Sequence, residues 1–322
     1  MPVQTAAARQ PEFIQTALPD AALLRAELAQ GLMRRPASVA SKFFYDALGS
    51  KLFEAITLLD EYGATRAEAA ILQQHLPAIA QACGQGHTLV DLGAGNCAKA
   101  ARLFAALQPQ RYVAVDISVE FLREAMQALQ AHHPQLPMLG LGMDLERLPA
   151  LPPQAGDGSR LMFYPGSSIG NFSPSAATAF LHRLRAMASG GPLLIGVDLL
   201  KPAEQLQQAY DDALGVTAAF NLNLLRHVNR LLSADFDPSQ WCHRALFEAA
   251  PARVEMHLEA RCDLVVQWPG ARRAFRQGER LLTEIACKYD RPGFDTLLRE
   301  AGYAHTRCWT DARESFAVFV AR

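Results

Sequence analysis

Charge of either sign is not in excess in this chain, where 31 lysine and arginine residues balance 32 aspartate and glutamate residues. Long basic runs are absent too. Because binding to nucleic acid relies on clustered lysine and arginine side chains, we expect no nucleic-acid partner.

Long apolar runs are also absent, since no stretch reaches the roughly 18 residues that a membrane-spanning helix needs. The N-terminus has no positive region followed by an apolar core, so we expect no secretory signal. We therefore expect a cytoplasmic protein without a membrane partner. The first residues are small and polar, and residues 1–17 are expected to be disordered.

Cysteine is scarce, and the six cysteines form no C-x-x-C pair. Histidines at zinc-finger spacing are missing as well, so we expect no metal site. Scattered cysteines in a chain of this size are typical of reduced thiols in a cytoplasmic protein core. They are Cys83, Cys97, Cys242, Cys262, Cys287 and Cys308.

What is present is the composition of a globular protein, with 322 residues that suffice for one large or two ordinary domains. Thr88–Leu92 has the pattern of a buried strand, Gly93-Ala94-Gly95 breaks it, and a helical pattern resumes at Cys97. Two glycines let the backbone turn sharply and approach a ligand closely. This order is typical of a nucleotide-binding α/β unit, although a plain tight turn is the alternative.

Strands and helices alternate from residue 86 to residue 199, which predicts a doubly wound parallel sheet. Ligands bind such sheets beyond the C-terminal ends of the strands. The expected strands are 88–92, 112–116, 138–141, 160–164 and 192–199, and the expected helices are 97–107, one from 118, and 173–187. The polar or glycine residues that follow these strands are Asp91, Gly93, Asp116, Asp144 and Asn171.

Asp116 is the most informative of these residues, because it ends the second strand 21 residues after Gly95. An acidic side chain at this distance can accept both hydroxyls of an adenosine ribose. The alternative is a surface aspartate that caps the next helix, although Ser118 is available for that role.

Segments on both sides of this unit predict a second region. Helices are expected over 20–35 and from Thr65 to Cys83, the latter opening with a capping box between Thr65 and Glu68. Helices at 202–214 and 216–233 are followed by a period-two pattern over 243–287, which predicts an antiparallel sheet. A helix over 292–301 and strands over 304–310 and 315–321 return to the first sheet.

Glu284 falls on the same predicted strand face as Leu282 and Ala286. An unpaired buried carboxylate costs several kcal/mol, so this side chain lies either in solvent or in a pocket with a partner. Tyr210 and Asn171 are candidate neighbours in such a pocket.

Five long motifs make this chain resemble the histidine Nα-methyltransferases of ergothioneine biosynthesis, from about residue 22 to the C-terminus. The motifs are Phe-Phe-Tyr-Asp-Ala-Leu-Gly-Ser from Phe43, Glu-Tyr-Gly-Ala-Thr-Arg-Ala-Glu from Glu61, Pro-Gly-Ser-Ser-Ile-Gly-Asn-Phe from Pro165, Tyr-Asp-Asp-Ala-Leu-Gly-Val-Thr-Ala-Ala-Phe-Asn-Leu-Asn from Tyr210, and Leu-Thr-Glu-Ile-Ala-Cys-Lys-Tyr from Leu282.

This resemblance implies a monomeric enzyme that trimethylates the α-amino group of L-histidine to hercynine with S-adenosyl-L-methionine (SAM). Its fold is a Rossmann-like class I SAM methyltransferase sheet (66–199 plus 291–322) with a second, α+β substrate-binding domain (18–65 plus 200–290). The residues implied to surround SAM are Gly93, Lys99, Asp116, Asp144 and Leu145. The residues implied to bind the amino acid are Tyr62, Asn171, Tyr210, Met256, Glu284, Ala286 and Phe53, with Tyr45 and Asn171 acting in catalysis.

Two departures from the family pattern keep the substrate open. Ala286 stands where the family has a serine, which removes one hydrogen bond to the imidazole, worth roughly 0.5–1.5 kcal/mol. Gly63-Ala64 replaces Tyr-Pro after Tyr62. The alternatives are an α-N-methyltransferase for another amino acid or a histidine derivative, a SAM-binding protein without activity and, more distantly, an NAD-binding oxidoreductase.

Overall fold

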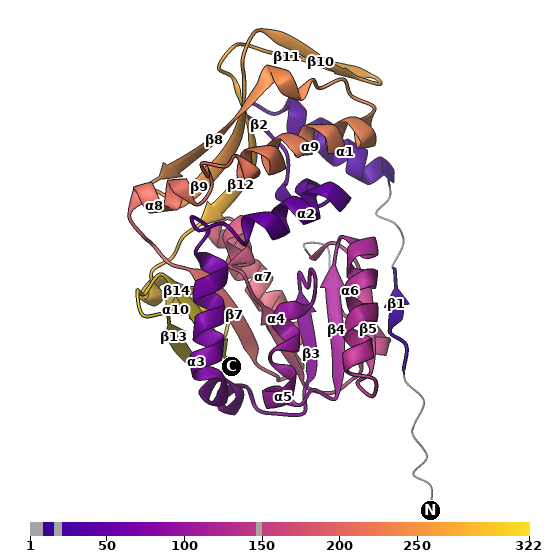
Figure 1. The fold of residues 1–322 in the computed structure, drawn as a ribbon, viewed down its shortest axis with the longest axis vertical. Helices are drawn as coiled ribbons and strands as arrows, with labels where there is room; N and C mark the ends of the chain where they lie inside the picture. Colours follow the sequence, from indigo (N-terminus) through magenta and orange to yellow (C-terminus); the bar gives the residue numbers. More distant parts are fainter. Residues whose placement is uncertain (1–8, 16–20, 146–149) are drawn as a thin grey trace, which may run out of the picture.

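The computed structural model describes residues 9–15, 21–145 and 150–322, which form two main sheets with helices packed against each (Figure 1). In the larger sheet the first six strands run parallel, and the last two form an antiparallel hairpin. In spatial order its strands are β1 (Glu12–Ile14), β5 (Met138–Gly142), β4 (Arg111–Asp116), β3 (Thr88–Leu92), β6 (Arg160–Tyr164), β7 (Leu193–Asp198), β14 (Phe316–Ala321) and β13 (Thr306–Thr310).

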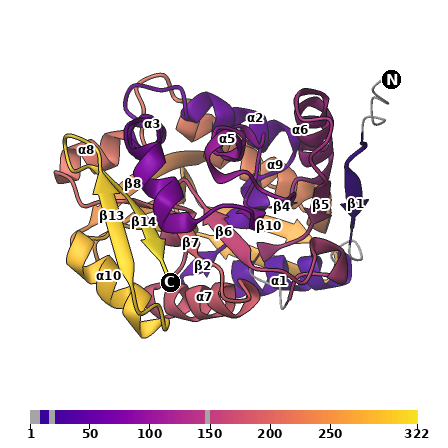
Figure 2. The ribbon, with the colours of Figure 1, turned by 90° about the horizontal axis from the view of Figure 1, so that it is seen from below.

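Aliphatic runs explain the central strands, because both faces of the larger sheet are covered by helices and side chains such as Val113 and Leu139 are fully buried. The predicted doubly wound sheet with its closing hairpin is confirmed. One face packs against α3 (Ala64–Cys83), α4 (Ala98–Ala101), α5 (Phe104–Leu107) and α6 (Val119–His132). The other packs against α7 (Pro174–Met187) and α10 (Arg291–Glu300), as Figure 2 shows. The single helix expected over 97–107 is instead the two short helices α4 and α5.

Residues 12–14 form the edge strand β1, so the expected disorder of residues 1–17 is wrong for this part of the segment. Phe13 explains why this short segment pairs with β5. A Cβ on Gly140 would lie 2.4 Å from Cε1 of Phe13, so only glycine leaves room for the ring. The guanidinium of Arg123 covers the ring at 4.3 Å from its centroid. Residues 1–8, 16 and 17 lie outside the described residues.

The smaller sheet is built from the N-terminal segment and the insertion, and it lies above the larger sheet in Figure 1. Its core joins Phe44 from the N-terminal segment to Leu224 and Trp241 from the insertion. We therefore propose the division into 66–199 plus 291–322 and 18–65 plus 200–290. The strands are β2 (Ala37–Ser38), β12 (Arg280–Cys287), β9 (Arg253–Ala260) and β8 (Trp241–Glu248), beside the hairpin β10 (Leu264–Trp268) and β11 (Ala271–Phe275). The helices are α1 (Ala21–Met33), η1 (Ser41–Phe44), α2 (Ala47–Ile56), α8 (Ala203–Gln208), α9 (Val216–Leu232) and η5 (Pro238–Gln240).

A β-bulge at Thr283 changes the face on which the β12 side chains lie. Leu282 pairs with His257, whereas Glu284 pairs with Met256, so Thr283 is an extra residue in the strand. Its hydroxyl donates a hydrogen bond to the carbonyl of Met256 at 3.0 Å. The expectation that Glu284 shares a face with Leu282 is therefore wrong, because the extra residue reverses the alternation. Glu284 and Ala286 lie on the inner face with Leu281.

The cysteine prediction is correct only in part. Cys83, Cys97 and Cys287 are buried and free, but Cys262 and Cys308 are exposed. No helix within the described ranges combines the length and the apolar character needed to span a membrane.

Candidate active site

The glycine turn after β3 lies against the end of β4. Gly93 and Gly95 have φ of 73° and 52°, the left-handed region that glycine adopts without strain. The Gly95 N–H donates to Oδ2 of Asp116 at 2.8 Å, and the Ser118 N–H donates to Oδ1 at 2.8 Å. No atom lies within 4 Å of a Cβ built on Gly95. The turn therefore has open space beside a carboxylate of fixed orientation.

Asp116 keeps acceptor capacity for a ligand, since each carboxylate oxygen has a further lone pair. Burial raises its pKa, and the backbone N–H groups of Ser118 and Gly95 act in the opposite direction. Ser118 does not cap α6 with its side chain. Its hydroxyl donates instead to the carbonyl of Tyr45 at 3.0 Å, which links this strand end to the smaller sheet's side of the molecule.

Glu68 connects the glycine turn to the loop after β6. Its Oε2 lies 2.6 Å from the ammonium of Lys99, and its Oε1 accepts the Gly166 N–H at 2.8 Å. Only 2% of Glu68 is exposed. The predicted capping box is wrong, because Gly63 is the N-cap of α3 and no side chain caps it. No local pattern around Glu68 indicates this role, since its partners lie 31 and 98 residues away.

Asp144 and Leu145 follow β5 and differ in their surroundings. Cδ1 of Leu145 lies 3.9 Å from a Cβ built on Gly93, so it lines the turn. The Asp144 carboxylate lies 2.9 Å from the ammonium of Lys42, which also pairs with Glu27 at 2.8 Å. Asp144 thus borders the turn while it holds the segment that precedes Tyr45.

Asp91 lies beneath the turn and not in it. It is 1% exposed and accepts a hydrogen bond from the Tyr112 hydroxyl at 2.8 Å. Burial raises its pKa to about 7, a shift that the bond from Tyr112 opposes. Its other oxygen, Oδ1, has no partner among the described residues.

A pocket with about 610 Å³ of empty space, part of it open to solvent, adjoins the turn through Gly166. All eight residues expected to bind or act on the amino acid line it: Tyr45, Phe53, Tyr62, Asn171, Tyr210, Met256, Glu284 and Ala286. Residues that the sequence reasoning did not single out also line it, among them Ser167, Asp198 and Phe220.

Aromatic rings form much of the pocket wall. The ring centroid of Phe53 lies 5.7 Å from that of Tyr45 and 6.1 Å from that of Phe220. Tyr62 and Tyr210 face each other edge-on at 6.3 Å. Burial raises the pKa of all three tyrosines well above 10, so their hydroxyls keep their protons at neutral pH. Such a wall suits a flat ring or an alkylated cation.

Glu284 points a carboxylate into this aromatic pocket. No hydrogen bond or ion pair joins it to another described side chain. Burial raises its pKa to about 7, and the charge of Lys288 opposes that rise. Glu284 is thus an acceptor without a partner among the described residues, as expected for a side chain that binds a ligand N–H.

Asn171 ends the short helix η4 (Ser168–Asn171), which packs directly on β12. A Cβ on Gly170 would lie 2.8 Å from the carbonyl oxygen of Cys287, so glycine permits this approach. The Asn171 side chain makes no hydrogen bond within the described part of the chain. Its amide is therefore available to a ligand in the pocket. Its backbone is held against β12, the strand that carries Glu284.

Lys288 lies behind Tyr210 and was not singled out from the sequence. Its ammonium donates to the Tyr210 hydroxyl oxygen at 2.8 Å and pairs with Asp198 at 2.8 Å. Lys201 pairs with the same carboxylate. Burial alone would raise the pKa of Asp198, but Lys288 and Lys201 outweigh it and hold that pKa below its ordinary value.

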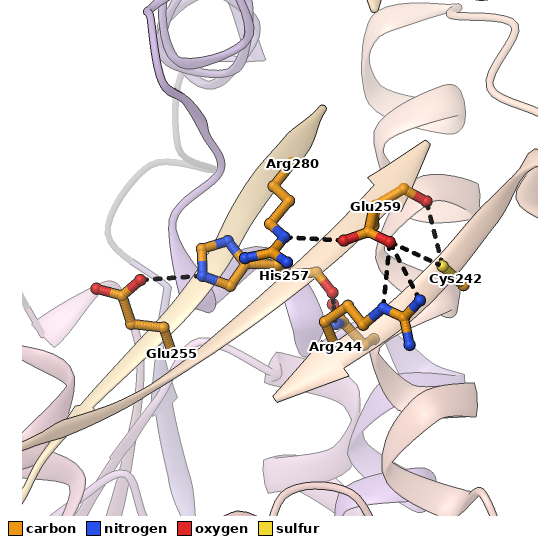
Figure 3. Close-up of polar contacts among 7 residues, drawn as sticks. Cys242, Arg244, Glu255, His257, Glu259 and Arg280 are labelled. Carbon is orange, nitrogen blue, oxygen red and sulfur yellow. Dashed lines mark hydrogen bonds and ion pairs between the residues drawn. The ribbon is translucent and has the colours of Figure 1, made fainter. Parts of the chain in front are cut away.

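The opposite face of the smaller sheet carries charges that pair among themselves (Figure 3). Glu259 accepts from Arg244 at 3.1 Å and from Arg280 at 2.9 Å. Glu255 lies 2.9 Å from Nε2 of His257. These side chains alternate along the strands with those of the pocket, so their charges pair away from it, whereas Glu284 on the inner face has no partner among the described residues.

Known proteins resemble this chain over nearly its whole length. A family model described as histidine-specific, SAM-dependent methyltransferase matches residues 24–322. The chain is 39% identical over 312 residues to histidine N-alpha-methyltransferase of Mycolicibacterium smegmatis, covering 92% of this chain and 94% of that protein. It is 27% identical over 292 residues to ergothioneine biosynthesis protein 1 of Neurospora crassa, covering 87% of this chain and 32% of that protein. A solved magnesium protoporphyrin IX methyltransferase from Synechocystis aligns with a TM-score of 0.43 at 14% identity, covering 87% of this chain and 97% of that one.

Proposed function

Because this chain belongs to the family of histidine-specific, SAM-dependent methyltransferases, we propose that it methylates the α-amino group of L-histidine. Three transfers give the trimethylammonium betaine hercynine, a step toward ergothioneine, the pathway for which the Neurospora relative is named. The unpartnered carboxylate of Glu284 among aromatic rings is the observation that best supports this substrate. It offers an acceptor to an imidazole N–H where the rings offer flat apolar surfaces.

The glycine turn fits SAM, which supplies an electrophilic methyl group on its sulfonium when bound. Asp116 would accept hydrogen bonds from the ribose hydroxyls with its remaining lone pairs. Gly93, Lys99 and Leu145 would surround the rest of the molecule. Asp144 would act from the border of the turn, since its carboxylate is paired with Lys42.

The amino acid would lie between the turn and the smaller sheet. Tyr62 and Tyr210 would donate to its carboxylate, because both hydroxyls stay protonated. Glu284 would accept the imidazole N–H, and Phe53 and Met256 would contact the ring. Ala286 adds only a methyl group to the wall two residues further along β12.

Positioning would supply most of the rate acceleration, since attack by a neutral amine needs no acid catalyst. The carbonyl oxygen of Asn171 would accept an amine N–H in the first two transfers and aim the nitrogen lone pair. The substrate ammonium would lose one proton to water before each transfer, and the neutral nitrogen would then gain the methyl group as the carbon–sulfur bond breaks. In the third transfer that nitrogen carries no N–H and becomes the quaternary ammonium. Tyr45 keeps its own proton because burial, followed by the charge of Glu284, raises its pKa well above 10. Its ring would contact the growing cation and would not act as a base.

Ala286 favours one second candidate, methylation of another amino acid or of a histidine derivative by the same chemistry. A substrate whose side chain forms no second hydrogen bond needs no hydroxyl group at position 286. The NAD-binding oxidoreductase is not supported, because the family is SAM-dependent. A cytoplasmic location and a monomeric state remain part of the proposal.

The deciding experiment is incubation of the full chain with SAM and a panel of amino acids, followed by mass spectrometry of the products. We expect histidine to be the best acceptor and to gain up to three methyl groups. If another amino acid is methylated preferentially, that amino acid and not histidine is the substrate. If no amino acid is methylated, the proposal of an amino-acid methyltransferase is refuted.

A further inference from the structure

We propose that Lys288 is a positioning residue that makes the α-carboxylate of the substrate a requirement for binding. It does so by turning the Tyr210 hydroxyl proton into the pocket and by leaving positive charge in the wall behind it. The inference rests on the proposed function in one respect, namely that the ligand is an α-amino acid.

The direction of the Tyr210 proton follows from the chemistry of its partner. An ammonium group has three donors and no acceptor, so the bond of 2.8 Å between Lys288 and Tyr210 uses the phenol oxygen as acceptor. The phenol proton cannot point at Lys288, and no other acceptor for it exists among the described residues. Since Tyr210 lines the pocket, its proton is available to a ligand there. A charged donor on the oxygen also polarises the hydroxyl and strengthens its donation.

The charges around Asp198 do not cancel. Its one carboxylate serves two ammonium groups, Lys288 with 2% and Lys201 with 12% of the side chain exposed. Lys201 also donates to the Ser315 carbonyl at 2.9 Å, a neutral partner. The three groups Asp198, Lys201 and Lys288 therefore carry one positive charge in excess next to the pocket. Asp311 near Lys201 and Glu284 near Lys288 offset it only through space, because no hydrogen bond or ion pair joins either carboxylate to a lysine of the cluster.

A ligand carboxylate would satisfy both features at once, whereas a decarboxylated amine would satisfy neither. A site built around a specific hydrogen bond rejects analogues that lack the matching group, since its own polar groups are left unpaired. Lys288 would thus separate amino acids from the corresponding amines, while Glu284 and Ala286 would separate one side chain from another.

The test compares amino acids with their decarboxylated amines by calorimetry in the presence of S-adenosylhomocysteine. Three pairs are used: histidine with histamine, tryptophan with tryptamine, and tyrosine with tyramine. For the preferred side chain we expect Lys288→Met to weaken binding of the amino acid by roughly ten- to a hundredfold, the range of a hydrogen bond to a charged group. Binding of the amine should change less than about threefold.

Two further variants keep the test decisive. Lys201→Met is the matched control, because Lys201 shares Asp198 but makes no bond to Tyr210, and it should lose less discrimination than Lys288→Met. Tyr210→Phe keeps the ring and the charge of Lys288, so it should lose much but not all of the discrimination that Lys288→Met loses, and adding it to Lys288→Met should cause little further loss. If Lys288→Met does not fold, the Tyr210→Phe variant still tests whether the hydroxyl proton of Tyr210 recognises the carboxylate.

The outcomes separate this inference from the proposed substrate. If tryptophan or tyrosine binds best, histidine is the wrong substrate, yet loss of discrimination in Lys288→Met would still support the inference. If Lys288→Met weakens amino acid and amine equally, its role is structural and the inference is overturned. Wild-type protein that binds amines as tightly as amino acids, or binds no amino acid, would also overturn it.

Discussion

Glu68, which is buried, and Lys99, which is partly exposed, form an ion pair with 2.6 Å between Oε2 and Nζ, although they belong to different structural elements. Glu68 lies in α3, and Lys99 lies in α4 directly after the glycine turn. Because the other oxygen of Glu68 holds the Gly166 N–H, one carboxylate sets the distance between the turn and the rim of the pocket.

Replacing Glu68 by Gln should weaken SAM binding about tenfold, since a charge-assisted bond to Lys99 becomes a neutral one. Gln still accepts from Gly166, so the pocket should keep its histidine affinity. Fluorescence or calorimetric titration with SAM measures the effect. In a double-mutant cycle with Lys99→Met the two losses should not add, and full additivity would show that the pair does not act as a unit.

Gly196→Ala should displace the carboxylate of Glu68. A Cβ on Gly196 would lie 2.0 Å from Oε1 of Glu68, so the side chain has to move. We expect a loss of about 1–3 kcal/mol in the free energy of unfolding, together with weaker SAM binding. Gly158→Ala is the control, because nothing lies within 4 Å of its Cβ, and its cost should stay below about 0.5 kcal/mol. Equal costs in urea denaturation would argue against crowding at Glu68.

Asn171→Ala should reduce turnover far more than it reduces SAM affinity, because Asn171 lines the pocket and is expected to aim the amine. A fall in kcat of about a hundredfold is expected for loss of orientation at the reacting atom. Steady-state kinetics and SAM titration on one preparation provide the comparison. Parallel losses in kcat and SAM affinity would contradict the aiming role.

Ala286→Ser should strengthen histidine binding by about two- to tenfold, the value of one neutral hydrogen bond to the imidazole. The matched control is Ala245→Ser, because Ala245 packs in the same small cluster as Ala286 but does not line the pocket. The control should lower stability and leave histidine affinity unchanged. If histidine affinity falls in Ala286→Ser while affinity for another amino acid is retained, the second candidate function gains support.

Glu284→Gln should change how stability depends on pH. The pKa of Glu284 is about 7 in the folded chain against 4.5 for an ordinary glutamate, so ionisation is disfavoured by folding. Wild-type stability should therefore decrease as the pH rises from about 4.5 to 7, by up to about 3 kcal/mol. The variant should be more stable than wild type at pH 8, similar at pH 4, and weaker in histidine binding. If the free energies of unfolding of wild type and variant differ by the same amount at every pH from 4 to 8, Glu284 is solvated in the folded chain.

The sequence predicted the larger sheet well, for a physical reason. Strands such as Thr88–Leu92 and Arg160–Tyr164 are buried on both faces, and their aliphatic runs are local signals. Six of the eight predicted pocket residues lie in the five motifs, whereas Phe53 and Met256 were implied by the resemblance alone. The structure brings these residues together, and their individual roles remain proposals.

Features that depend on distant partners could not be predicted. β1 exists because Phe13 fits over Gly140, more than a hundred residues later in the chain. No glycine near Thr283 indicates the bulge in the sequence, and the bulge places Glu284 on the opposite face from Leu282. Glu68 has the spacing of a helix cap, and only the tertiary structure shows that its carboxylate binds Lys99 instead.

The contact of Gly170 with the Cys287 carbonyl has a consequence for the length of the substrate. Asn171, next to Gly170, would hold the amine, while Glu284 on β12 would hold the far end of the side chain. Because no side chain separates the two backbones, the span between these groups cannot stretch. With this binding mode, the site would discriminate by the number of carbons between amine and ring, and a homologue longer by one methylene would satisfy only one end.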